Sequence, residues 1–299
     1  MQLPNKGTAC PCPPGDAGMP LSATVANVQA LEGKVDELWK RREELDERDE
    51  SARAVVLSVM ELLDGGHLRV AEIDRDGEVK VHEWLKQAVV LLFRLCPLES
   101  SEAGPMLFSD RLPPKGRSPG VRVVPGAYAR FGSYIAAGAI LMPSFVNVGA
   151  YIGADTLIDT WAAVGSCAQV GERVHISGGV GVGGVLEPLR ANPVIVESDA
   201  FIGSRCMLIE GVRVGRGAVL GAGLIFSPTI PVIDASSGEE LARGHIPAWS
   251  VAITAVRSRC FPGGEFGLPC ALVIKRLAEG ERPDKVKLNE LVRSHGAAL

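Results

Sequence analysis

Three glycines are spaced as in a dinucleotide-binding turn. Gly179, Gly181 and Gly184, within SGGVGVGGVLEP, satisfy the G-x-G-x-x-G pattern, in which backbone N–H groups bind a pyrophosphate. The pattern predicts such a site only where the glycines follow a strand and open a helix, with an acidic residue about 20 residues later. Here a Glu-Pro and an Asn-Pro pair follow, and no Lys-Ser or Lys-Thr completes a phosphate-binding loop. The glycines therefore need another explanation.

Thiols and imidazoles offer little further chemistry. Cys10 and Cys12 lie close together but have no partners at ligand spacing, so we expect no metal site. Cys167 has no evident basic partner, and Cys206 occupies a place for a small inward residue in the repeat described below, so neither is predicted to be a nucleophile. His175 is predicted to point outward from that repeat and could act as a general base.

Composition limits the class of protein. The chain has 299 residues, of which 46% are hydrophobic, and a net charge of −4, which disfavours binding to nucleic acid. Seven cysteines, an odd number without framework spacing, predict a reducing cytoplasm. The uncharged segment Ala218 to Ile233 contains glycine and proline and is shorter than the ~18 apolar residues of a membrane helix, so we expect no membrane span. Residues 1–21 lack the apolar run of a signal peptide and are expected to be disordered.

Residues 22–96 have the pattern of a small α+β domain. Helix-forming residues at helical spacing alternate with a Gly-Gly stop and an Asp-Gly turn between two alternating segments. The predicted elements are a helix over 22–49, a helix over 51–63, a hairpin turning at Asp76-Gly77 and a helix over 84–95. Residues 97–120, rich in Pro, Gly and Ser, are predicted to be a linker.

Residues 121–226 carry an aliphatic residue every six positions, and a small or β-branched residue follows four places later in nearly every hexad. Such hexads predict a parallel β-helix, in which each hexad forms one side of a triangular coil and the aliphatic side chain points to the axis. Glycines then occupy tight corners, which explains the three glycines above. Residues 227–299 depart from the period and are predicted to be C-terminal strands and a helix. The predicted axial residues are Ile140, Val146, Ile152, Ile158, Val164, Val170, Ile176, Val182 and, after an interruption near 187–195, Val196, Ile202, Leu208, Val214 and Leu220.

Longer strings within this pattern are more specific than the repeat. LIDTWAAVGSCAQVGERVHISGGVGVGGVLEP, FIGSR, IEGV and CALVIKR, together with LLDGGHLRVAE and HEWLKQAVVLLFR, resemble the tetrahydrodipicolinate N-succinyltransferase family of the hexapeptide-repeat acyltransferase superfamily. The resemblance covers about residues 52–294 and leaves residues 1–50 outside. It implies a left-handed β-helix, an exception to the usual right-handed crossover. It also implies a homotrimer in which neighbouring coils share each active site.

The chemistry implied by the resemblance is N-succinylation in lysine and diaminopimelate biosynthesis. The amino group of ring-opened tetrahydrodipicolinate, L-2-amino-6-oxopimelate, attacks the thioester of succinyl-CoA. No bound cofactor and no metal are expected, and succinyl-CoA is a co-substrate. The site then needs cations for two carboxylates, a proton acceptor and a groove for the CoA arm.

Five residues match the family's acceptor site. Arg122 is expected to hold a substrate carboxylate and Asp159 to orient or deprotonate the amine, whereas Trp161 shapes the same pocket. Glu187 and Arg205 are candidate polar contacts. The hexad alone favours an ordinary corner residue at Asp159, and it is the resemblance that favours a functional role. Glu187 and Arg205 could equally be salt-bridged wall residues.

Two further groups match the CoA-binding region. Lys275 and Arg276, in CALVIKR, could meet CoA phosphates, although a cationic pair on a strand is also typical of a solvated face. A run of small residues would leave room for the pantetheine arm. These small residues are Gly221, Ala222 and Gly223.

One position departs from the family pattern. An acidic residue commonly stands two places after the arginine of FIGSR, whereas this chain has Met207. Either Asp159 accepts the proton, helped by Glu210 or His175, or the acceptor has changed. A paralogous N-acyltransferase that uses another amino acid or acetyl-CoA therefore remains an alternative, as does a catalytically silent β-helix scaffold. The related carbonic anhydrases need three zinc-binding histidines, and only His175 lies among the hexads, so we exclude them.

Overall fold

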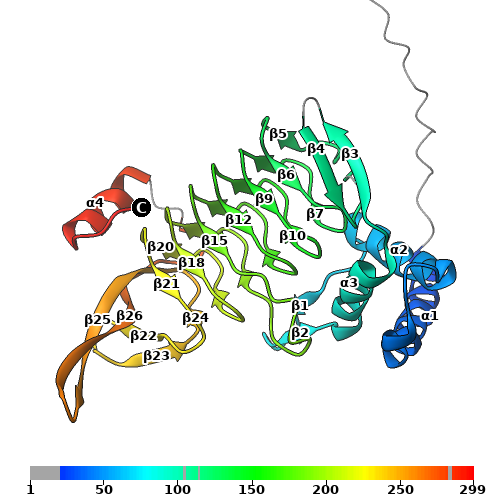
Figure 1. Cartoon of the computed structure of the whole chain (residues 1–299). Coiled ribbons are helices and arrows are strands. Elements are labelled where there is room, and N and C mark those ends of the chain that lie inside the picture. Colours follow the sequence, from blue (N-terminus) through cyan, green and yellow to red (C-terminus); the bar gives the residue numbers. More distant parts are fainter. Residues whose placement is uncertain (1–20, 104–105, 114, 282–284) are drawn as a thin grey trace, which may run out of the picture.

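The computed structural model describes residues 21–103, 106–113, 115–281 and 285–299. The expected tail at 1–21, with Cys10 and Cys12, lies outside them apart from its last residue. Figure 1 shows helices at one end, a coil of short strands in the middle, and a long hairpin with a final helix at the other end.

The N-terminal helices pack into a unit with its own apolar core. The helix expected over 22–49 ends at Lys40, where a 3₁₀ turn follows. Asp49, the last residue of the expected helix, instead caps the next helix by accepting a hydrogen bond from the Ala52 N–H at 2.9 Å. The Asp76-Gly77 turn lies in the predicted hairpin. The elements are α1 (Leu21–Lys40), the 3₁₀ turn η1 (Arg42–Glu44), α2 (Glu50–Asp64), β1 (Ala71–Ile73), β2 (Val79–Val81) and α3 (Glu83–Leu95).

The segment predicted as a linker, residues 97–120, contains an antiparallel hairpin of β3 (Glu99–Ala103) and β4 (Met106–Asp110). The serine- and glycine-rich composition gives no alternation of apolar and polar residues, so these strands could not be predicted from the sequence. Its end is tied to the coil, because both oxygens of Asp110 accept hydrogen bonds from Arg130 Nη2, at 2.8 and 2.7 Å.

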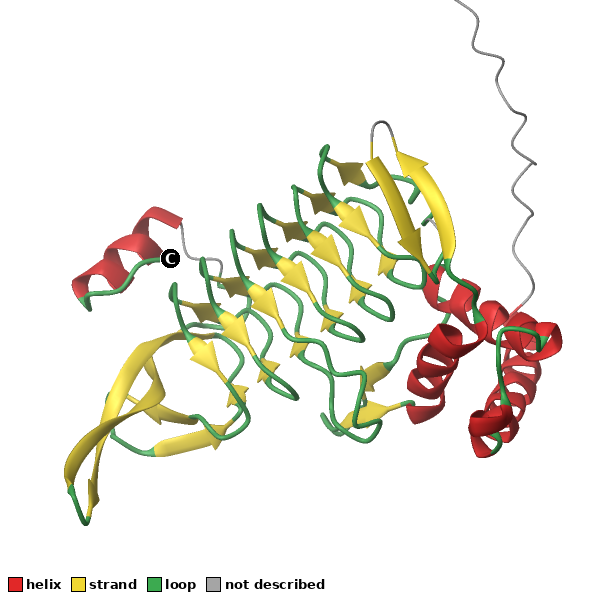
Figure 2. Ribbon diagram, in the orientation of Figure 1, coloured by secondary structure: helices red, strands yellow, loops and turns green. Residues whose placement is uncertain are grey.

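The middle of the chain is a parallel β-helix with three walls (Figure 2). The first wall contains β5 (Arg122–Val123), β8 (Ile140–Leu141), β11 (Leu157–Ile158), β14 (His175–Ile176), β17 (Phe201–Ile202) and β20 (Val219–Leu220). The second contains β6 (Tyr128–Ala129), β9 (Phe145–Val146), β12 (Ala163–Val164), β15 (Gly181–Val182), β18 (Met207–Leu208) and β21 (Ile225–Phe226). The third contains β7 (Tyr134–Ile135), β10 (Tyr151–Ile152), β13 (Gln169–Val170), β16 (Ile195–Val196), β19 (Arg213–Val214) and β24 (His245–Ile246).

The hexad prediction of the axis is confirmed from Val146 onward, where every predicted axial residue is at most 3% exposed. It is wrong at Ile140. Leu141 is 2% exposed and pairs with Ile158, whereas Ile140 is half-buried on the outer face. The corner after Leu141 is one residue shorter than a full hexad, so the phase slips by one position there.

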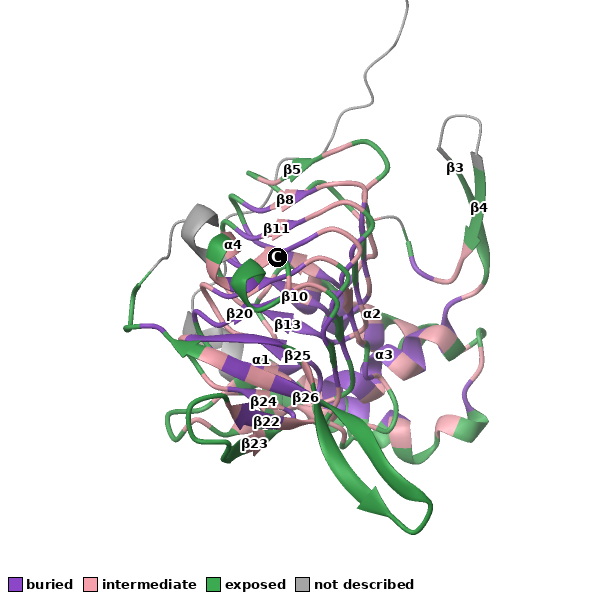
Figure 3. Cartoon of the chain, turned by 90° about the vertical axis from the view of Figure 1, so that its left-hand side faces the viewer, coloured by how far each residue is buried: buried purple, intermediate pink, exposed green. Residues whose placement is uncertain are grey.

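The coil continues past residue 226, where we expected it to end. β24 pairs with β19, and the start of β25 (Ser250–Phe261) pairs with β20. Beyond them, β26 (Gly264–Arg276), β22 (Pro231–Asp234) and β23 (Glu240–Arg243) extend the first-wall sheet, and α4 (Lys285–Ser294) lies near the end of the chain. Figure 3 shows that the far end of the β25–β26 hairpin is exposed.

Candidate active site

The corners between the first and second walls, which we call the first edge, stack one predicted site residue above another. In successive coils one corner residue has a positive φ, and the Gly179 N–H donates to the Thr160 carbonyl at 2.9 Å in a pattern that recurs from coil to coil. A positive φ is costly for a side chain other than glycine. The corner residues are Trp161 (61°), Gly179 (69°), Arg205 (59°) and Gly223 (77°).

Gly179 on the first edge and Gly181 on the second wall have no side chain, which leaves room for larger side chains of the next coil to pack over them. A Cβ atom added to Gly179 would lie 3.3 Å from Arg205 Cγ, and one added to Gly181 would lie 2.6 Å from Met207 Cε. The glycines of the opening motif are therefore explained by close approach in the coil.

Asp159 lies at the same edge, two residues before Trp161. It is half-buried, and its Oδ1 accepts hydrogen bonds from the Thr160 N–H at 2.6 Å and the Thr160 hydroxyl at 3.2 Å. Trp161 is 78% exposed, and Arg205 is exposed at the corner two coils further along the same edge. The structure thus brings a carboxylate held by its own corner, an aromatic face and a guanidinium group to one edge.

The run of small residues also lies at the first edge, but only part of it is open. The Ala222 N–H donates to the Ala298 carbonyl at 2.7 Å, and Gly221 is buried beside Ile253. Gly223 is exposed, and an added Cβ there would meet nothing within 4 Å. The C-terminal residues therefore cover two of the three positions expected to face the pantetheine arm.

Arg122 lies on the opposite side of Asp159 from Arg205 along the coil. It is exposed on β5, two coils before Asp159. Two strand spacings place the two backbones about 10 Å apart. The same two spacings separate Arg205 from Asp159 in the other direction, so within one chain neither arginine lies next to Asp159.

The three other candidate proton-transfer and polar groups lie on different parts of the coil. His175 is on the first wall, one coil beyond Leu157, and its ring stacks on Phe201 with centroids 4.7 Å apart. Glu187 and Glu210 are exposed at the edge between the second and third walls. In a single chain only His175 is a diagonal neighbour of Asp159.

Lys86 positions the loop that carries Glu187, and the sequence analysis missed it. Its side chain is fully buried, and Nζ donates to the carbonyls of Leu189 at 3.1 Å and Ala191 at 2.8 Å, with Pro188 at 3.4 Å. Burial lowers the pKa of the Lys86 ammonium group. The available signal was a lysine within the apolar face of α3, EWLKQAVVLL.

The cations predicted to meet CoA have carboxylate neighbours in the structure. Lys275 Nζ lies 3.8 Å from Glu281, and Arg276 lies 3.9 Å from Asp234. All four side chains are on the C-terminal sheet or directly after it. A role in CoA binding would have to compete with these ion pairs.

The thiols behave as buried small residues. Burial raises the pKa of Cys167 to about 12 and that of Cys206 to about 11. Neither is suited to nucleophilic attack near neutral pH, as predicted.

The described ranges contain neither a metal-binding cluster nor a membrane-spanning helix. No three His, Cys, Asp or Glu side chains there lie close enough to hold a metal ion. His245, on the third wall, is a second histidine in the coil, which corrects the expectation that only His175 lies there. No described helix is both long and apolar enough to cross a membrane.

Known proteins match both parts of the chain. The model of the tetrahydrodipicolinate N-succinyltransferase N-terminal domain matches residues 30–95, and that of the hexapeptide repeat of succinyl-transferase matches residues 193–226. The resemblance therefore begins earlier than residue 52, where we expected it. The hexapeptide match supports the left-handed coil.

Curated relatives match over nearly their full length. A 2,3,4,5-tetrahydropyridine-2,6-dicarboxylate N-succinyltransferase of Dechloromonas aromatica (strain RCB) is 43% identical over 272 residues, covering 88% of this chain and 98% of that protein. A protein of the same name from Paramagnetospirillum magneticum (strain ATCC 700264 / AMB-1) is 44% identical over 277 residues, with the same coverage. With this identity across both the helical unit and the coil, the chain belongs to the tetrahydrodipicolinate N-succinyltransferase family.

Proposed function

We propose that this protein transfers the succinyl group of succinyl-CoA to the amino group of ring-opened tetrahydrodipicolinate. The observation that carries the proposal is the identity of 43–44% to relatives of that name over 98% of their length. The first edge supports it, because Asp159, Trp161 and Arg205 all lie along it. The reaction belongs to lysine and diaminopimelate biosynthesis, which is expected in the cytoplasm.

The edge supplies the groups that the transfer needs. The substrate nitrogen attacks the thioester carbon, the carbon–sulfur bond breaks, and CoA leaves as a thiolate. Asp159 accepts the proton lost by nitrogen, and that proton neutralises the thiolate. Arg205 holds a carboxylate of the acceptor, since its planar guanidinium group can donate two parallel hydrogen bonds. The exposed Trp161 ring covers the chain of the acceptor.

A second copy of the chain completes the site in this proposal. The outward side chains of the second wall form an apolar column that is exposed in one chain: Tyr128 is 46%, Phe145 38%, Met207 43% and Ile225 59% exposed. Packing this column against a neighbouring coil would bury it in a homotrimer. It would also bring a neighbour's Arg122 to the first edge.

Mixing two inactive variants tests the shared site. Asp159→Asn and Arg122→Gln would each inactivate the pure trimer. Mixed trimers, formed by unfolding and refolding the two together, should regain thiol release because some sites then combine two intact residues. Mixtures as inactive as the pure variants would place both residues in the site of one chain. A monomer by light scattering at micromolar concentration would contradict the trimer.

Met207 favours one second candidate, an N-acyltransferase with a changed acceptor or acyl donor. Its thioether cannot accept a proton or hold an ammonium group. Thiol release should be measured with succinyl-CoA or acetyl-CoA, each with ring-opened tetrahydrodipicolinate or 2-aminopimelate. Release with the succinyl donor and the first acceptor supports the proposal. Release with another pair supports a changed enzyme, and no release with any pair supports a silent scaffold.

A further inference from the structure

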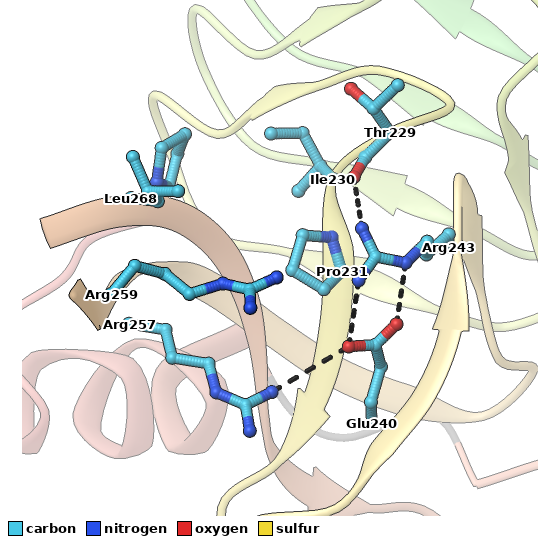
Figure 4. A pocket seen from close by; sticks show the side chains of 9 residues that line it. Thr229, Ile230, Pro231, Glu240, Arg243, Arg257, Arg259 and Leu268 are labelled. Carbon is cyan, nitrogen blue, oxygen red and sulfur yellow. Dashed lines mark hydrogen bonds and ion pairs between the residues drawn. The ribbon is translucent and has the colours of Figure 1, made fainter. Parts of the chain in front are cut away.

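Three arginines converge on one pocket beyond the last coil (Figure 4). The pocket has a volume of about 220 Å³ and lies between the β25–β26 hairpin and the β22–β23 pair. We call it the arginine pocket. It is lined chiefly by Arg243, Arg257, Arg259, Glu240, Ile230 and Leu268.

The charges in the arginine pocket do not balance. Among the described residues that line it, Glu240 is the one carboxylate. It lies 2.7 Å from Arg243 Nε and 3.7 Å from Arg257 Nη1. Arg243 Nη1 also donates to the Thr229 carbonyl at 3.0 Å, which fixes that guanidinium group. An excess of two positive charges is left in the pocket.

The backbone forces two of these cations side by side. Arg257 and Arg259 are two residues apart on β25, so their side chains leave the same face of the strand. Leu268, opposite Arg257 on β26, presents an apolar surface on that face. Figure 4 shows both arginine side chains extending from β25 toward β22 and β23. Neighbouring like charges repel, and an anion between them would remove that repulsion.

The pocket lies at the C-terminal end of the coil. β25 follows β20 in the first-wall sheet, and the pocket-lining Thr229 to Pro231 come directly after β21 of the second wall. From the strand that precedes Asp159 to β25 there are four strand spacings, about 19 Å. This spacing runs along the coil axis to the start of β25, and Arg257 and Arg259 lie further along that strand. A CoA molecule with its thioester beside Asp159 and its arm directed toward the last coil would bring its phosphate end to the end of the coil at which this pocket lies.

We propose that the arginine pocket binds a phosphate group. Guanidinium groups match phosphate oxygens with paired hydrogen bonds, and the pocket offers Arg259 and the outer faces of Arg243 and Arg257. The phosphate could come from the 3′-phosphate of CoA or from free phosphate. The CoA source rests on the proposed function, whereas phosphate binding itself does not.

Calorimetric titration of the intact protein with CoA, dephospho-CoA and inorganic phosphate tests the proposal. The variant is the double substitution Arg257→Gln and Arg259→Gln, at exposed positions that should not affect folding. Arg41→Gln with Arg48→Gln is the matched control, because it removes two charges from the N-terminal unit. Each charged hydrogen bond removed should weaken phosphate binding about tenfold or more. The difference in affinity between the wild type and the pocket variant should be smaller at high salt.

The outcomes separate the two sources. If CoA is the source, the pocket variant binds CoA at least tenfold more weakly, and its affinity for dephospho-CoA is unchanged. If free phosphate is the source, inorganic phosphate binds the wild type and not the variant, and both protein forms bind the two CoA compounds alike. The proposal is overturned if the wild type binds none of the three, if the pocket variant binds all three as tightly as the wild type, or if the matched control weakens binding as much as the pocket variant does. Failure of the proposed function would appear separately, as absent thiol release.

Discussion

The second and third walls are built from the same hexads, yet one is bare and the other is covered. On the third wall, the Arg69 guanidinium lies 3.8 Å from the centroid of the Tyr151 ring and its Nε donates to Gln169 Oε1 at 3.1 Å. These contacts hold the N-terminal unit on the coil. On the second wall, Phe145 and Met207 occupy equivalent outward positions and remain exposed. The inward residues build the axis, whereas the outward residues decide what each wall binds.

The largest effect is expected at the first edge, which borders the bare wall. Asp159→Asn should lower the rate of thiol release by about 10² to 10⁴, the usual contribution of a positioned base. Its thermal midpoint should stay near that of the wild type, since Asn can still accept the bond from the Thr160 N–H. Steady-state kinetics and a melting curve on one preparation check both. If a fall in stability accounts for the lost activity, Asp159 has only the structural role of an ordinary corner residue.

A matched pair of outward substitutions tests the comparison of the walls. Tyr151→Ala removes the ring beneath Arg69 and should destabilise the chain by about 2 kcal/mol, through lost area and the cation–π contact. Phe145→Ala on the second wall should leave the unfolding midpoint of a dilute monomer nearly unchanged and weaken self-association instead. Denaturant unfolding and light scattering across a concentration series measure the two effects. Equal destabilisation by both substitutions would mean that the walls do not differ in this way.

Lys86, on the N-terminal unit that covers the third wall, tests whether this unit positions the loop with Glu187 for binding of the acceptor. Lys86→Met keeps the buried aliphatic stem but removes the donor to the Leu189 and Ala191 carbonyls, and should cost about 1 to 3 kcal/mol. If the loop carries Glu187 into the acceptor site, KM for the acceptor should rise while KM for succinyl-CoA does not. Arg53→Met, at a residue of α2 outside the loop, is the control. A change in neither KM would limit Lys86 to a structural role.

The coil could be predicted from the sequence because a residue facing the axis must recur every six positions. The same spacing places Asp159 and Arg205 at corners, so their placement along one edge follows from the stacking of hexads. The slip at Ile140 could not be predicted, because a corner shortened by one residue leaves an aliphatic residue in both phases. The arginine pocket could not be predicted either. It needs the register of β25 against β26 and the return of β23, which no local pattern specifies.

The smallest effect is expected where the bare wall departs from the family, at Met207. Met207→Glu places a carboxylate on an exposed position over Gly181, so folding should be unaffected. If this protein is a weakened succinyltransferase, a second acidic group near Arg205 should raise kcat/KM on ring-opened tetrahydrodipicolinate about tenfold, at the low end of what base assistance contributes. Met207→Gln, with similar size and no charge, should give no gain. If the acceptor has changed, Met207→Glu should instead lower activity on the true acceptor, because a charge then enters an apolar contact. Unchanged activity in Met207→Glu, together with loss in Asp159→Asn, would show that Asp159 alone accepts the proton and that the departure has no catalytic meaning.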